Sequence, residues 1–362
     1  MHDEPTGDGA GRDVDQADHI GYGGCPMQNS LSAREIHARY PAIDGHADSI
    51  WRYLADPEGF FGDGRIGHLD SRRLRETGQN VQIMAVYTPP EQADLAALQY
   101  ALDFLHAINA VLDSPSNAAL RPPYRRILTP SDLRAACAPG AYGFLLFIEG
   151  ASPLRGNLKN LDAFHRLGIR GITITHNHDN EAALGCFAEG AGRGLSPFGR
   201  ELVGEMNRRG MVIDLAHSNE DLFWETLALA RKPVIDSHTG LRAFWDHPRN
   251  LRDEQLDAVR KNGGVVCIDY LPDHLLARQE PKPRMQIEQV VRVIEHAAGR
   301  MGIDHVGLGA DWDGFEETVE GLEDCAQLPR LTEALLRSGM PEADVAKVLG
   351  GNMLRALCAA ME

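Results

Sequence analysis

Imidazole and carboxylate groups stand directly after short apolar segments at several places in this sequence. His46 and Asp48 are two residues apart, so on an extended strand their side chains point to the same side. Glu149, His217 and His238 each come at the end of a further apolar segment. Imidazole and carboxylate together suit zinc or a similar divalent ion. A single histidine of this kind is more often a structural group. The joint placement of the five residues nevertheless predicts a metal centre.

These five residues could hold two metal ions. His46 and Asp48 would form one side of the site, and His217 and His238 would form the other. Glu149 would then bridge the two ions through its carboxylate. Two ions about 3.5–4 Å apart can share a hydroxide and make it a nucleophile at neutral pH. The pattern therefore favours metal-dependent hydrolysis.

Eight segments rich in apolar and β-branched residues would position these groups. They lie around residues 42–44, 81–87, 144–148, 171–175, 211–215, 233–236, 264–268 and 305–309. Helix-like stretches separate most of them or follow the last, as at 94–112, 221–231, 252–261, 287–301 and 342–361. Near-continuous apolar strands alternating with amphipathic helices predict a parallel sheet covered by helices. Eight such units fit an α/β fold of the (β/α)8 TIM-barrel type better than an open doubly wound sheet. The first strand also lacks a following glycine-rich dinucleotide fingerprint.

In such a barrel the reactive residues gather at the carboxyl ends of the strands. Further groups of this kind end the fourth, seventh and eighth segments, namely His176, Asp269-Tyr270 and Asp311-Trp312-Asp313. Taken alone, Asp311 and Asp313 could equally cap a turn. Seven of the eight strands would thus end in a group that can bind a metal or move a proton.

The charge of the chain limits its partners and suggests its organisation. The 362 residues carry a formal net charge of −16, which argues against nucleic acid or an anionic membrane surface as the main partner. The sequence contains no run of about 18 apolar residues, which a membrane-spanning helix would need. We expect residues 1–30 to be an acidic, disordered tail and residues 31–362 to be a single barrel domain. Six scattered cysteines and the absence of a secretory pattern lead us to expect a cytoplasmic protein.

Motifs spread along the chain resemble those of the membrane (renal-type) dipeptidase family, in its bacterial form. They are Asp44-Gly45-His46-x-Asp48, Ile148-Glu149-Gly150, Thr173-x-Thr175-His176, Gly194-Leu195-Ser196-Pro197-Phe198-Gly199, Ile213-Asp214-Leu215-Ala216-His217-Ser218, Ser237-His238, His247-Pro248-Arg249-Asn250, Gly309-x-Asp311-x-Asp313-Gly314 and Gly350-Gly351-Asn352-x-Leu354-Arg355. The family belongs to the amidohydrolase superfamily of barrels. The resemblance implies a zinc-dependent hydrolase that cleaves dipeptides, often with a D residue at the C-terminal position.

The resemblance also implies a role for each site residue. His46 and Asp48 would bind one zinc ion, and His217 and His238 would bind the other. Glu149 and a hydroxide would bridge the two ions of each subunit.

Four more residues would act on the substrate. Asp311 would take a proton from the bridging water and pass it to the leaving amine. His176 would stabilise the developing oxyanion, and Arg249 would hold the C-terminal carboxylate of the dipeptide. Tyr270 matches a substrate-contact position of the family, although an ordinary tyrosine at the barrel rim explains it equally well.

Two alternatives stay open at this point. The first is another amidohydrolase-type enzyme, such as a deaminase or a lactone or phosphotriester hydrolase. Such deaminases typically open with H-x-H, and many binuclear members bridge their metals with a carboxylated lysine on strand four. Residues 171–177 contain no lysine, which favours the dipeptidase branch. The second is a non-catalytic or repurposed barrel that serves a biosynthetic pathway, with a substrate other than a free dipeptide; the intact ligands and Asp311 argue against lost catalysis. We expect a small dipeptide as the ligand and regard a homodimer as compatible with the resemblance.

Overall fold

Eight parallel strands form a closed barrel in the computed structural model. The structure describes residues 31–62, 66–88, 96–187, 194–276 and 284–362. The barrel strands are β1 (Ile43–Ala47), β2 (Val81–Tyr87), β4 (Tyr142–Glu149), β5 (Ile169–Thr173), β6 (Val212–Asp214), β7 (Ile235–Thr239), β8 (Val265–Ile268) and β9 (Val306–Leu308). Neighbouring strands pair in the order β2-β1-β9-β8-β7-β6-β5-β4, and the pairing of β2 with β4 closes the ring. Each predicted segment overlaps one of these strands, so the predicted (β/α)8 barrel is confirmed. The acidic tail predicted at 1–30 lies outside the described residues.

A ninth strand, β3 (Tyr124–Arg126), extends the sheet outside the ring. It pairs in parallel with the start of β4, where Arg126 lies opposite Phe144. The sequence did not predict this strand, because two of its three residues are arginines and no apolar run marks it.

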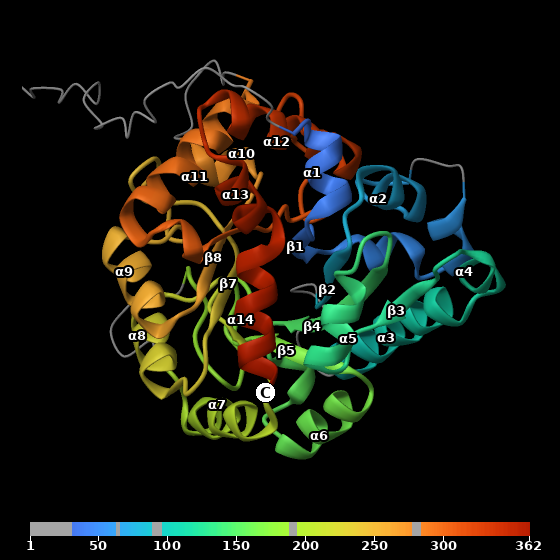
Figure 1. Ribbon diagram of the computed structural model, residues 1–362. Helices are drawn as coiled ribbons and strands as arrows, with labels where there is room; N and C mark the ends of the chain where they lie inside the picture. Colours follow the sequence, from blue (N-terminus) through green and yellow to red (C-terminus); the bar gives the residue numbers. More distant parts are fainter. Residues whose placement is uncertain (1–30, 63–65, 89–95, 188–193, 277–283) are drawn as a thin grey trace, which may run out of the picture.

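Helices surround the barrel or lie across its end (Figure 1). They are α1 (Ala33–Arg39), α2 (Ser71–Thr77), α3 (Ala97–Asp113), α4 (Pro115–Ala119), α5 (Pro130–Ala136), α6 (Leu158–Arg166), α7 (Pro197–Arg209), α8 (Glu220–Leu229), α9 (Asp253–Asn262), α10 (Pro272–Leu275), α11 (Ile287–Met301), α12 (Leu328–Arg337), α13 (Glu342–Ala346) and α14 (Asn352–Met361). Several begin at a polar residue whose side chain accepts a backbone N–H of the first turn, such as Ser196 before α7 and Asn219 before α8. Among the described residues no helix combines the length and the apolar character needed to cross a membrane.

The last predicted helix, over 342–361, is confirmed and contains one irregular turn. A π-helical turn at Lys347–Gly351 lies between α13 and α14, and the chain stays helical through it. The turn brings Gly350 against the start of β1. A Cβ atom on Gly350 would lie 2.4 Å from the carbonyl oxygen of Pro41, which only a glycine avoids. The close approach of this turn to Pro41 therefore requires a glycine at 350, although glycine is unfavourable inside a helix.

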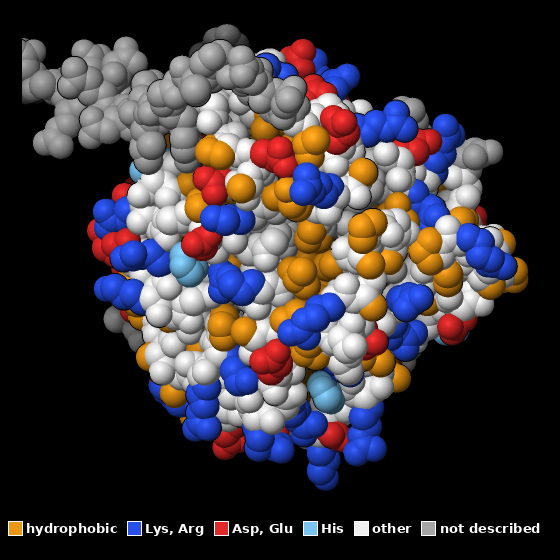
Figure 2. Space-filling model, in the orientation of Figure 1, with side chains coloured by type: hydrophobic (Ala, Val, Ile, Leu, Met, Phe, Trp, Pro, Cys, Tyr) orange, Lys and Arg blue, Asp and Glu red, His pale blue; other side chains and the backbone are white. Residues whose placement is uncertain are grey.

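Helix α14 closes the amino end of the barrel. Figure 1 shows it lying across the middle of the ring of strands. Its residues Met353 and Leu357 join a buried cluster with barrel residues such as Ile43, Leu145 and Val265. On the face that carries α14, acidic and basic side chains are interspersed (Figure 2). The opposite end, where the carboxyl ends of the strands lie, is left to hold the functional groups.

A buried arginine connects α2 to a segment far along the chain. Arg73 is only 4% exposed. Its Nε donates to Asp70 Oδ2 and its Nη1 to Asp324 Oδ2, both over 2.8 Å. Two carboxylates therefore compensate one buried guanidinium.

Replacing Arg73 with methionine should lower the free energy of unfolding by about 3–5 kcal/mol, because the buried carboxylate of Asp70 and the half-buried carboxylate of Asp324 lose their partner. Urea denaturation followed by circular dichroism would measure the change. Arg72→Met is the matched control, since Arg72 pairs with Glu76 at the surface of the same helix. That control should cost less than about 0.5 kcal/mol. Equal losses in the two variants would contradict a structural role for the buried pair.

Candidate active site

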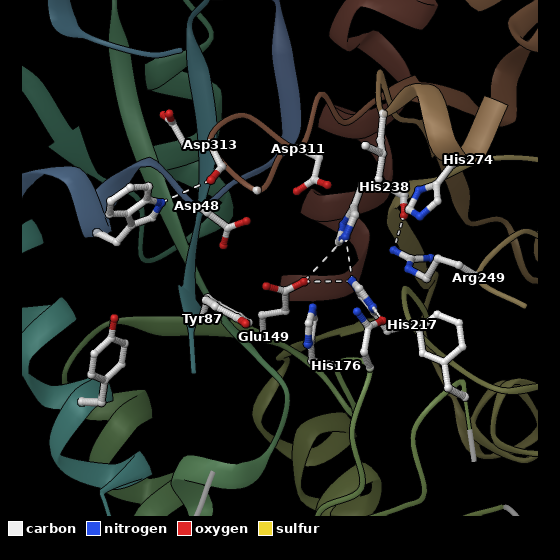
Figure 3. A pocket seen from close by; sticks show the side chains of 16 residues that line it. Asp48, Tyr87, Glu149, His176, His217, His238, Arg249, His274, Asp311 and Asp313 are labelled. Carbon is white, nitrogen blue, oxygen red and sulfur yellow. Dashed lines mark hydrogen bonds and ion pairs between the residues drawn. The ribbon is translucent and has the colours of Figure 1, made fainter. Parts of the chain in front are cut away.

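The predicted metal ligands come together at the carboxyl ends of the strands. His46 lies on β1 and Asp48 just beyond it, Glu149 is the last residue of β4, and His238 lies on β7. His217 follows β6 in a turn, with a positive φ of 61° that is uncommon for a residue other than glycine. Figure 3 shows Asp48, Glu149, His217 and His238 around one cavity. The cavity has a volume of about 500 Å³, which is typical of a small-molecule site.

The carboxylate of Glu149 lies between the two predicted pairs of ligands. Its Oε2 is 3.6 Å from His46 Nε2. Its Oε1 is 3.0 Å from His217 Nε2 and 3.6 Å from His238 Nε2. Asp48 lies on the first side, with its Oδ2 3.7 Å from His46 Nε2. The two oxygens of one carboxylate thus face two separate sets of ligand atoms, which is the arrangement that a bridging ligand requires.

The donor atoms fit divalent cations. His46 Nε2 and Asp48 Oδ1 are buried and have no hydrogen-bond partner among the described residues. A Cβ atom on Gly314 would lie 2.3 Å from Asp311 Oδ1 and 2.7 Å from Asp48 Oδ2, so the glycine keeps this space open. Three groups of residues place one ligand atom each within 4.8 Å of one another, namely His46, Glu149 and His238; Glu149, His176 and His217; and His46, Asp48 and Asp311. Buried, unpartnered nitrogen and oxygen atoms in such groups are suited to hold metal ions.

Neighbouring side chains fix the orientation of two imidazoles. Asn177 Oδ1 lies 2.8 Å from His217 Nδ1, and Ser237 Oγ lies 2.9 Å from His238 Nδ1. With Nδ1 engaged, each ring directs Nε2 toward Glu149. Metal-ligating histidines are usually held in this way through their other ring nitrogen.

Burial and charge set the protonation of the predicted ligands. Burial lowers the pKa of both His217 and His238 well below the usual range, which favours the neutral ring that binds metal. Burial alone would raise the pKa of Glu149, but the charges of His46 and His176 hold it well below its ordinary value. Burial opposes charge on His46 as well, yet the neighbouring carboxylate of Glu149 raises its pKa well above normal. The negative charge of Glu149 therefore favours a positive charge beside it in this buried site.

Asp311 and His176 flank these ligands. Asp311 lies beyond β9, its φ is 61°, and its backbone N–H donates to the carbonyl oxygen of His46. Burial raises the pKa of Asp311 well above its usual value, and the charges of Asp48 and Glu149 raise it further. His176 packs its ring 4.4 Å from that of His217, and its Nδ1 is buried without a partner. Both residues line the cavity.

Arg249 brings a buried positive charge to the cavity wall. The residue is 3% exposed, and its Nη2 donates to the carbonyl oxygen of His238 over 2.6 Å. Within the described ranges, its Nε has no hydrogen-bond partner. In the part of the chain that the structure describes, no carboxylate forms an ion pair with this guanidinium. A buried cation without a counterion is costly, so the position suits an anionic group of a ligand.

Tyr270 is placed apart from the other predicted residues. It is fully buried, its ring packs against Trp312 at a centroid distance of 5.5 Å, and it does not line the cavity. Its contact with a substrate stays a prediction. The cavity wall instead includes residues that the sequence did not single out, namely Trp51, Tyr87, Tyr100, Phe187, Leu271 and His274. All but Tyr87 lie beyond the strand ends, on helices or connecting segments, where strand-end patterns give no signal.

Comparisons with known proteins agree with this geometry. The model of the membrane dipeptidase family, peptidase family M19, matches residues 31–362. Dipeptidase tcpJ of Claviceps purpurea is 32% identical over 303 residues, covering 80% of this chain and 69% of the relative. Dipeptidase verJ of Clonostachys rogersoniana is 29% identical over 352 residues, covering 91% of this chain and 86% of the relative.

A solved structure of a metallopeptidase also matches this fold. A metallopeptidase from Rhodobacter sphaeroides, liganded with a phosphinate mimic of the dipeptide L-Ala-D-Ala, superimposes with a TM-score of 0.80 at 28% identity. The match covers 89% of this chain and 99% of that chain. The resemblance inferred from the motifs is confirmed: the chain belongs to the membrane dipeptidase family and is a metal-dependent peptidase.

Proposed function

We propose that this protein is a binuclear zinc dipeptidase that hydrolyses L-Xaa-L/D-Xaa dipeptides. The observation that carries the proposal is the position of Glu149, whose two carboxylate oxygens face separate sets of ligand atoms. The related Rhodobacter sphaeroides metallopeptidase, whose structure contains a phosphinate mimic of a dipeptide, supports the substrate class.

The ligand set suits zinc. His46 and Asp48 would hold one ion, His217 and His238 the other, and Glu149 would contact both. When bound, two zinc ions lower the pKa of a water molecule and polarise the carbonyl group of the substrate.

The remaining residues would bind the dipeptide and move protons. Asp311, whose raised pKa makes its carboxylate a ready proton acceptor, would accept a proton from the attacking water and deliver it to the leaving amine. His176 would donate a hydrogen bond to the oxygen that gains charge as the carbonyl is attacked. Arg249 would bind the C-terminal carboxylate of the substrate, which supplies the counterion that the guanidinium lacks.

The metal requirement gives the first test of this proposal. Purified protein should contain about two equivalents of zinc and hydrolyse dipeptides. A chelator should abolish the activity, and added zinc should restore it. Elemental analysis and an assay of released amino acids would measure both quantities. Protein that binds no divalent ion and stays inactive after zinc addition would refute the proposal.

Asp311→Asn should separate proton transfer from metal binding. The amide cannot accept the proton, so kcat should fall by about 10²–10⁴-fold, while the zinc content stays near that of the wild type. Steady-state kinetics and elemental analysis on the same preparation would decide the matter. Because Asp311 lies within 4.8 Å of His46 and Asp48 ligand atoms, a parallel loss of zinc would show instead that it is a ligand.

Arg249→Met should mainly weaken binding of substrates with a free carboxylate. We expect KM for such dipeptides to rise about 10- to 100-fold, because a charge-assisted hydrogen bond is lost, while the dipeptide amides change little. The matched control is Arg252→Met, which removes an exposed arginine of the same region. A uniform loss across free and amidated substrates would contradict the carboxylate contact.

A further inference from the structure

We infer that His274, held by Asp269, is a second donor to the terminal carboxylate of the substrate, beside Arg249. The inference deepens the proposed function and rests on it. It assigns a substrate-binding role to a residue that no strand-end pattern marked.

A buried carboxylate fixes the imidazole of His274. Asp269 directly follows β8 and is fully buried. Its Oδ2 accepts a hydrogen bond from His274 Nδ1 over 2.6 Å, which is short for an N–H···O contact. The backbone N–H of Leu271 donates to the other carboxylate oxygen over 3.3 Å. With Nδ1 engaged, Nε2 is the ring nitrogen left for a ligand, and His274 lines the cavity.

One short segment holds both His274 and Arg249 in place. Asn250, the neighbour of Arg249, donates its Nδ2 to the carbonyl oxygen of His274 over 2.6 Å. His247 accepts the backbone N–H of Arg249 at its Nδ1 over 3.3 Å and lies 5.3 Å from the ring of His274. A Cβ atom on Gly240 would lie 2.3 Å from the carbonyl oxygen of His274, so this packing is close. Figure 3 shows Arg249 and His274 side by side on one wall of the cavity.

A carboxylate bound by Arg249 has lone pairs left for a further donor. Arg249 Nη2 gives one N–H to the carbonyl oxygen of His238, so its other donors can engage a carboxylate, whose two oxygens accept about four hydrogen bonds. A carboxylate removed from water requires several hydrogen bonds to offset its desolvation. His274 can supply one of them from Nε2, the ring nitrogen that Asp269 leaves open.

The imidazole of His274 also separates the carboxylate of Asp269 from the ligand. Without the imidazole, the carboxylate of Asp269 would face an incoming carboxylate of the same sign. With the imidazole of His274 between them, that carboxylate is kept from direct contact with the ligand, and the positive charge of Arg249 is available to the ligand. The wall thus offers the guanidinium of Arg249 to a group with one negative charge.

His274→Phe tests the inference because phenylalanine keeps a ring but donates no hydrogen bond. KM for dipeptides with a free C-terminal carboxylate should rise about 10-fold, and kcat should change less than about 3-fold. The matching dipeptide amides should be unaffected. His274→Gln, which retains an N–H donor, should recover part of the loss. The matched control is His296→Phe, because His296 pairs with Asp253 on the outer helices, at 3.1 Å.

A binding measurement makes the result independent of turnover. Calorimetric titration of zinc-loaded protein with leucine and with leucinamide would measure carboxylate recognition directly. The wild type should prefer leucine, and His274→Phe should reduce this preference about 10-fold. Wild-type protein that prefers leucine but cleaves no dipeptide would refute the proposed function and leave the inference standing. An unchanged preference in His274→Phe, or a fall in kcat alone, would overturn the inference.

Discussion

The carboxylate of Glu149 is the group around which the site is built. It is buried among imidazoles from three other strand ends, and each of its oxygens contacts a different set. Burying so many titratable groups together is unfavourable unless charges compensate and hydrogen bonds are satisfied. The barrel meets this demand because parallel strands bring residues distant in sequence to one end, and because Asn177 and Ser237 engage the second nitrogen of two rings.

The positions that could be predicted from the sequence are those with a regular pattern. Eight apolar segments gave the eight barrel strands, and polar residues at their ends gave the cluster around Glu149. Strand β3 was missed because hydrogen bonding to β4, rather than an apolar run, makes it a strand. The π-helical turn before α14 was missed because it accompanies a contact between Gly350 and Pro41, about 300 residues apart in the chain.

Several residues that line the cavity walls could not be predicted either, because tertiary contacts place them. His274 enters the site through the short helix α10, and its orientation comes from Asp269 and Asn250 together. Tyr270, in contrast, follows a strand end as expected, but its ring packs inward against Trp312. A strand-end position fixes where the backbone lies, whereas tertiary packing decides which way a side chain points.

The closure of the barrel by α14 divides the molecule into two parts that can change independently. The packing of Met353 and Leu357 into the strands lies at the end remote from the cavity. Side chains of the opposite rim, such as Trp51 and Phe187, are 41% and 51% exposed and contribute little to that packing. Evolution, or directed mutagenesis, can therefore alter the selectivity of the rim at small thermodynamic cost, while the floor preserves the architecture.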